Sequence, residues 1–189
     1  MLKTISSAIL LAASIGPASA QDWSIDVYGG MVADGSLIWD GDAYDTGNGK
    51  TLGFGIYSTA MVNGLALGVD VMSSGTDYVD YTDSISAVSL MLAGRYAIPL
   101  GDRLSATLGG GIGAMRVSYD AGEEAGFASD SSTVLGGQAE LGLRYQMEGG
   151  PTVFGAVKYQ STFGDVEFDD GLVAEYDTTS AILGISFRM

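Results

Sequence analysis

The last stretch of the chain, residues 176–189, alternates between two faces without interruption. One face is mainly apolar and consists of Thr179, Ala181, Leu183, Ile185, Phe187 and Met189. The other face carries smaller or polar residues such as Thr178, Ser180 and Ser186, and ends with Arg188. Alternation with a period of two is typical of a half-buried β-strand, and this stretch is longer than most globular strands. The sequence therefore predicts a long, half-buried final strand.

Similar stretches recur along the chain and are joined by connections of two lengths. The predicted strands are 23–33, 51–61, 65–72, 85–98, 104–117, 132–146, 152–162 and 176–189. The connections alternate long and short, at 34–50, 62–64, 73–84, 99–103, 118–131, 147–151 and 163–175. The short connections contain turn-forming residues, such as Asn63-Gly64 and Gly149-Gly150-Pro151. Eight antiparallel strands with this rhythm predict an all-β, up-and-down transmembrane β-barrel.

The first 20 residues have the features of a secretory signal peptide. Lys3 supplies a positive start, residues 8–15 form a short apolar run, and Ala18-Ser19-Ala20 is a small-residue cleavage site. The apolar run is too short for a membrane-spanning helix. We therefore expect residues 1–20 to be removed and residues 21–189 to form one barrel domain.

Alternation alone does not distinguish a membrane barrel from a soluble one, and two further features favour the membrane. The aromatic residues Trp23, Tyr96, Tyr145 and Phe187 all lie on the apolar face, next to the short turns or the chain ends. Such a girdle is typical of a membrane interface. The polar face is rich in Gly, Ala and Ser, with few charges, which suits a narrow interior better than a surface in water.

The fifth predicted strand fits the alternation least well, because continuous alternation would turn Arg116 towards lipid. Two hypotheses compete. A bulge at residues 109–111, which are all glycine, would reverse the alternation and turn Met115, Val117 and Tyr119 outward. Alternatively, Arg116 extends to the outer headgroups. The glycine run slightly favours the bulge.

Six charged residues fall on inward positions, and their charges balance. They are Asp26, Asp70, Glu140, Arg95, Arg144 and Lys158. Unpaired charge inside a narrow barrel is costly, whereas hydrogen-bonded pairs are tolerated. We therefore expect Glu140 to bridge to one or both arginines, with Asp26 and Lys158 extending the network and with Tyr57 and Gln138 nearby. Such a network would plug the lumen, and a structural role is favoured over a selectivity filter.

The composition excludes several classes of function. The chain has no His and no Cys, so Ser/His/Asp and Cys/His catalytic sites are impossible, and we expect no enzyme, no cofactor and no metal centre. The net charge of −15 argues against nucleic-acid binding. Most of the acidic residues fall in the four long connections, where they predict a solvated surface that binds Ca²⁺ or Mg²⁺ weakly, if at all.

The C-terminal residues Gly184, Phe187 and Met189 give the chain a family resemblance. The ending resembles the closing strand of bacterial outer-membrane β-barrels, in which a glycine and aromatic residues form an assembly signal; Met189 stands where that family usually has Phe. The whole mature length resembles the small eight-stranded outer-membrane proteins typified by OmpX and the OmpA membrane domain, which belong to the outer membrane protein β-barrel domain family.

The resemblance implies a location and partners, and it gives no specific activity. It implies an integral protein of the bacterial outer membrane with a structural or surface-interaction role, with both termini on the periplasmic side and the long loops outside the cell. Outer-membrane lipid, lipopolysaccharide and the barrel-assembly machinery are the implied partners. A small-solute channel and a soluble periplasmic ligand-binding barrel remain as alternatives.

Overall fold

The computed structural model describes residues 23–39, 42–45, 49–58, 64–77, 84–120, 130–167 and 173–189. Nearly all of these residues belong to β-strands: β1 (Trp23–Trp39), β2 (Asp42–Asp45), β3 (Gly49–Ser58), β4 (Leu65–Asp77), β5 (Ser84–Pro99), β6 (Leu104–Asp120), β7 (Asp130–Gln146), β8 (Thr152–Thr162), β9 (Val166–Glu167) and β10 (Val173–Arg188). The predicted signal peptide lies outside the described residues and stays a prediction. No helix in the described part of the chain is long and apolar enough to cross a membrane.

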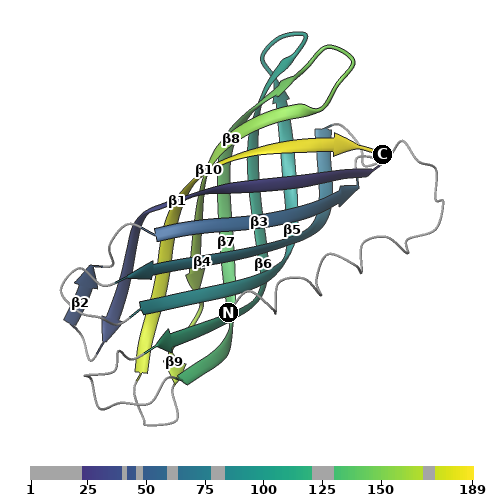
Figure 1. Ribbon diagram of the computed structural model, residues 1–189. Helices are drawn as coiled ribbons and strands as arrows, with labels where there is room; N and C mark the ends of the chain where they lie inside the picture. Colours follow the sequence, from purple (N-terminus) through teal and green to yellow (C-terminus); the bar gives the residue numbers. More distant parts are fainter. Residues whose placement is uncertain are drawn as a thin grey trace.

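The eight long strands form one closed antiparallel barrel (Figure 1). Each long strand pairs with the next one along the chain, and β1 pairs with β10 to complete the circle. The two short strands add to this wall: β2 pairs with the far end of β1, and β9 pairs with the start of β10. The structure thus confirms the eight-stranded up-and-down barrel that the rhythm of the sequence predicts.

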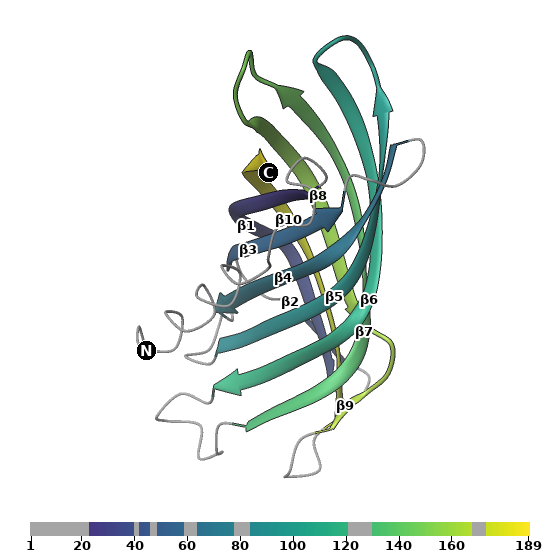
Figure 2. The same ribbon diagram turned by 90° about the vertical axis from the view of Figure 1, so that its right-hand side faces the viewer.

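Two ends of the barrel can be distinguished. Figure 2 shows the β5–β6 and β7–β8 turns side by side at the top, which we call the turn end; β9 lies at the opposite, loop end. The turn end also holds the C-terminus, where the Met189 amide donates a hydrogen bond to the Trp23 carbonyl oxygen over 2.9 Å. Gly64 and Gly149 have φ values of 87° and 60°, a conformation that favours glycine in tight turns.

Several strands are longer at the loop end than the sequence predicts. β1 continues to Trp39 where residue 33 was expected as its end, and β4 continues to Asp77 where residue 72 was expected. Regular pairing continues along this extension, for example between Thr76 and Ile85. The apolar alternation ends earlier because outward positions beyond the lipid need no apolar side chains, while the backbone still needs its hydrogen bonds.

The bulge predicted in the fifth strand is wrong. The register between β6 and both of its neighbours runs without a shift through the glycines at 109–111. Met115 and Val117 are fully buried, and Arg116 points outward, where its Nη2 donates a hydrogen bond to Ser131 Oγ over 2.8 Å. Arg116 thus lies near the loop end. A register shift does occur in the described pairing of β1 with β10, between Val32 and Asp34.

The two faces of the wall are inverted relative to a soluble protein. In β7, Leu141 is 64% exposed, whereas its neighbour Glu140 is 5% exposed. The same pattern holds around the barrel, with large exposed apolar residues on the outside that include Met31, Leu52, Leu67, Leu92, Ile112, Leu135, Val157 and Leu183. Soluble proteins rarely expose an apolar surface of this extent to water. The outer face is therefore suited to lipid.

We predict that charge in the middle of this outer face prevents insertion. Leu141→Arg places an arginine about halfway between Tyr145 and the end of the apolar face, where it should cost roughly 2–4 kcal/mol and reduce assembly in lipid vesicles. Leu67→Arg in β4 should behave in the same way. Assembly is measured by heat-modifiable migration on a gel.

The matched control is Thr133→Arg, because Thr133 is exposed in the same strand beyond the apolar belt. This variant should assemble like the parent. Equal assembly of Leu141→Arg and Thr133→Arg would show that the inside and outside faces are wrongly assigned.

Candidate functional site

The first part of the site is a pair of arginines that share one carboxylate. Asp26 on β1 is fully buried, and Arg144 on β7 donates to its two oxygens over 3.0 Å each. Arg95 on β5 donates from Nη1 to Asp26 Oδ2 over 2.6 Å. A carboxylate with bidentate and charge-assisted hydrogen bonds is held in one orientation. Asp26 therefore ties together three strands from different sides of the barrel.

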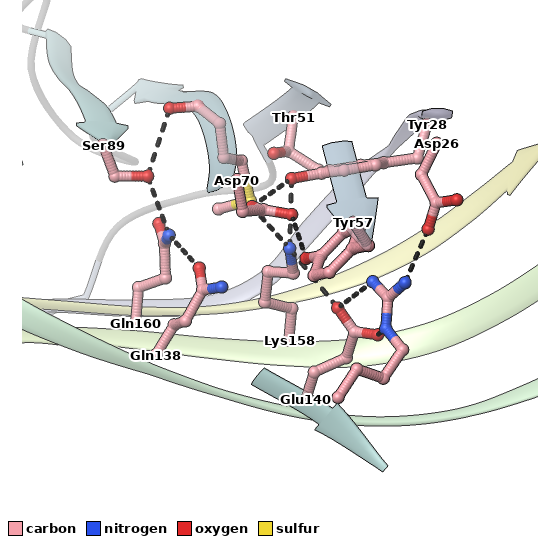
Figure 3. Close-up of polar contacts among 12 residues, drawn as sticks. Asp26, Tyr28, Thr51, Tyr57, Asp70, Ser89, Gln138, Glu140, Lys158 and Gln160 are labelled. Carbon is pink, nitrogen blue, oxygen red and sulfur yellow. Dashed lines mark hydrogen bonds and ion pairs between the residues drawn. The ribbon is translucent and has the colours of Figure 1, made fainter. Parts of the chain in front are cut away.

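Glu140 on β7 links this group to a second one. Arg95 Nε lies 3.1 Å from Glu140 Oε1, and Lys158 Nζ on β8 lies 3.4 Å from Glu140 Oε2. Lys158 also lies 2.8 Å from Asp70 Oδ1 on β4. Figure 3 shows Lys158 and Glu140 approaching Asp70 and Asp26 across the lumen. We call Asp26, Asp70, Arg95, Glu140, Arg144 and Lys158 the ionic network.

Two tyrosines complete the hydrogen bonding of Asp70. Tyr28 Oη donates to Asp70 Oδ1 over 2.8 Å, and Tyr57 Oη donates to Asp70 Oδ2 over 2.9 Å. Lys158 Nζ donates to Tyr28 Oη over 3.0 Å. The rings also face the cations, with Arg95 4.1 Å from the centre of the Tyr57 ring and Lys158 4.5 Å from that of Tyr28. These contacts stabilise cations that have lost their water.

Further towards the loop end, the lumen changes from ionic to neutral. Gln160 Nε2 donates to Ser89 Oγ over 2.8 Å and to Gln138 Oε1 over 3.1 Å (Figure 3). Beyond this layer the interior is filled by an apolar cluster of Ile85, Ala87, Met91, Met115, Val117, Val166, Ala174 and Tyr176. The lumen is thus packed by side chains over most of its described length, in keeping with a barrel of eight strands.

The six charged side chains of the ionic network are buried, and their charges balance. Its three carboxylates match its three cations, and none of the six side chains is more than 12% exposed. Each ion has hydrogen-bonded partners, so the desolvation cost is offset by the pairing. Removal of one partner would leave an uncompensated buried charge, which would destabilise the barrel.

Glycines on the inner wall provide the space that the long side chains occupy. A Cβ atom at Gly53 would collide with the ring and the Oη of Tyr28, and one at Gly184 would lie 2.5 Å from Cζ of Phe154. At Gly109 of β6, a Cβ would lie 3.3 Å from that of Glu140. Gly109 of β6 therefore leaves room for Glu140 and Arg95 of the ionic network.

The structure brings together all six charged residues that the sequence singled out. Glu140 pairs with Arg95 and Lys158, whereas the carboxylate that Arg144 contacts is that of Asp26. The sequence identified Asp70 as an inward charge but gave it no partner, and it missed the part played by Tyr28. Tyr28 lies on the polar face of its strand, and this signal could have identified it.

The remaining predicted residues lie at the turn end. Tyr96, Tyr145 and Phe187 are between 46% and 49% exposed on the outer face, and Trp23 is partly exposed. Gly184 lies on the inner face and Met189 at the chain end. The acidic connections are only partly described, and the described residues contain no group of metal-ligating side chains that could hold a metal ion. The expectation of weak cation binding stays a prediction.

A closed barrel with an apolar outer face and an ion-paired interior defines the class of an integral membrane β-barrel. The sequence agrees with this class, since residues 5–188 match the family model described as "Outer membrane protein beta-barrel domain". The chain therefore belongs to this family, and it is a protein of the bacterial outer membrane. None of the curated proteins matches the chain.

Solved structures with the same fold include three outer-membrane proteins. Neisserial surface protein A is 12% identical with a TM-score of 0.60, and the match covers 88% of this chain and 97% of that one. OprG from Pseudomonas aeruginosa is 16% identical with a TM-score of 0.56, covering 89% and 97%. A major outer membrane protein from Thermus thermophilus is 15% identical with a TM-score of 0.55, covering 88% and 99%. At these identities the likeness shows the fold alone.

We predict that Gly53→Ala weakens the site through Tyr28. The added methyl group requires the Tyr28 ring to move away from Asp70, and such overpacking should lower the free energy of unfolding by about 1–3 kcal/mol. Urea unfolding in lipid vesicles measures this change. The control is Gly110→Ala, where the nearest atom to the new Cβ, the Gln138 carbonyl oxygen, would be 3.5 Å away. A loss of stability equal to that of the control would contradict this account.

A double-mutant cycle at Lys158 and Asp70 tests the pairing itself. Lys158→Met leaves Asp70 as an unpaired buried charge, which should cost about 3–5 kcal/mol of unfolding free energy. In the double variant with Asp70→Asn, no charge is left unpaired between these two positions. One tyrosine can still donate to the amide oxygen, and the other can accept a hydrogen bond from the amide NH2 group. The double variant should therefore be more stable than the sum of the single changes predicts; additive losses would show that the two groups are not coupled.

Proposed function

We propose that this protein is a closed outer-membrane barrel with a structural or surface-interaction role, and that its lumen is plugged by the ionic network. The observation that supports a plug is the complete pairing of three carboxylates with three cations in a lumen where none of these side chains is more than 12% exposed. Solutes could pass only if these pairs separated, which costs several kcal/mol for buried ions.

The position of the ionic network also supports a closed barrel. Its members come from β1, β4, β5, β7 and β8, so the pairs cross the lumen in several directions. The neutral layer of Gln138 and Gln160 and the apolar cluster follow towards the loop end. A solute would need to displace three successive layers.

We also propose that the protein is not an enzyme. The chain has no histidine and no cysteine, which excludes catalysis by those side chains. The buried carboxylates Asp26, Asp70 and Glu140 are each engaged by cations or hydroxyl groups, so they are poorly placed to act on a substrate. A barrel with a structural or surface-interaction role in the outer membrane needs no catalytic group.

The partners that we propose follow from the outer face and the two ends. Trp23, Tyr96, Tyr145 and Phe187 would form the girdle at the periplasmic interface, with the turn end in the periplasm. Gly184, Phe187 and Met189 would form the signal for the barrel-assembly machinery. The acidic loop end would face the cell exterior, next to lipopolysaccharide and to Ca²⁺ or Mg²⁺ bound weakly, if at all.

Conductance in planar lipid bilayers tests the plug. The purified parent protein should remain closed, because the ionic network fills the lumen. Glu140→Gln removes the carboxylate shared by Arg95 and Lys158, and this change should produce openings that the parent lacks. The matched control is Arg103→Gln, which neutralises an exposed arginine at the turn end that is ion-paired with Glu148.

The control variant should stay closed like the parent. Steady, wide conductance from the parent would contradict the plug and would favour the alternative of a small-solute channel. Openings of equal frequency in Arg103→Gln and Glu140→Gln would show that the ionic network does not control the passage.

A further inference from the structure

A cavity of about 460 Å³ opens at the turn end, on the opposite side of the ionic network from the apolar cluster. Its lining includes four arginines, Arg95, Arg103, Arg144 and Arg188. The base of the cavity is formed by Arg95 and Arg144, which belong to the ionic network, so we infer that the cavity is blind. Arg103 and Arg188 lie at its more exposed rim.

The charge of this lining is opposite to that of the molecule. The chain carries 8 lysines and arginines against 23 acidic residues, yet four of its basic residues line one cavity. Among the described residues that line it, no side chain is acidic. The carboxylates that pair with Arg95 and Arg144 lie outside this lining. Such a concave surface of one charge attracts small anions.

The cavity also has donors that the protein leaves free to bind a ligand. In the described part of the chain, no ion pair joins Arg188 to an acidic side chain. Among the described residues Arg103 pairs with Glu148 alone, and both of these side chains are largely exposed, so water and salt can replace that pair. Around the arginines, the lining adds hydroxyl groups from Ser24, Ser105 and Thr107. Thr152 and Gln146 also line the cavity, but the Thr152 hydroxyl donates to Gln146 Oε1 and the Gln146 amide donates to the Gly150 carbonyl oxygen.

We propose that this turn-end cavity binds a phosphate group, with Arg103 and Arg188 as its principal charged ligands. A guanidinium group donates two parallel hydrogen bonds to the oxygens of a phosphate, and neutral hydroxyl donors complete its coordination. Arg144 supports the bound anion from the base of the cavity while it remains paired with Asp26. The ligand would be a small phosphate compound in water or the headgroup of an anionic phospholipid.

Isothermal titration calorimetry of the full barrel in zwitterionic micelles tests this site. One arm uses inorganic phosphate, and the second uses a short-chain phosphatidylglycerol. Arg188→Gln and Arg103→Gln should each weaken binding by about tenfold, which is the loss expected for one charge-assisted contact. The matched control is Arg116→Gln, which removes an exposed arginine from the loop end.

Tight binding in the first arm alone would identify a water-soluble phosphate compound, and binding in the second arm alone would identify a lipid headgroup. The proposal is overturned if neither probe binds the parent, or if Arg116→Gln weakens binding as much as the two rim variants do. Because Arg188 lies in the last strand, Arg103→Gln serves as the test if Arg188→Gln fails to assemble.

The outcome of the phosphate-binding experiment does not depend on the outcome of the conductance experiment. A barrel that conducts could still bind phosphate at its turn end, and a closed barrel could fail to bind it. Failure of the phosphate site can therefore be distinguished from failure of the plugged lumen.

Discussion

The structure depends on the fact that lipid cannot form hydrogen bonds with the backbone. A sheet that spans a membrane must therefore pair every strand, and the β1–β10 ladder satisfies this condition by closing the circle. Closure with eight strands leaves a lumen that is only wide enough for side chains. Polar groups that cannot face lipid must fit into this narrow space, where each charge needs a partner.

The ionic network is the consequence of this constraint. Its residues are far apart in the sequence, and they meet because the barrel places their strands on opposite walls of one lumen. The inner glycines are as important as the charged residues, since Gly53 and Gly109 leave the space in which Tyr28 and Glu140 lie. The network and its glycine surroundings therefore form one packed unit.

The interior of the barrel is apolar at the loop end and basic at the turn end. The apolar cluster at the loop end packs the lumen without charge, whereas the turn end exposes arginines in a cavity. An anion that approaches from the turn end meets a basic surface, although the chain as a whole is strongly acidic. The ionic network lies between these two regions.

The strand number could be predicted from the rhythm of the connections, and the six inward charges from alternation with a period of two. The lipid-facing side also needed the aromatic girdle and the sparse charge of the polar face. Three features became clear from the folded barrel: Arg144 pairs with Asp26, Asp70 accepts hydrogen bonds from two tyrosines, and β6 has no bulge. These features depend on register and on side chains that meet across the lumen. Alternation within one strand carries no information about which opposite residue lies at the same height.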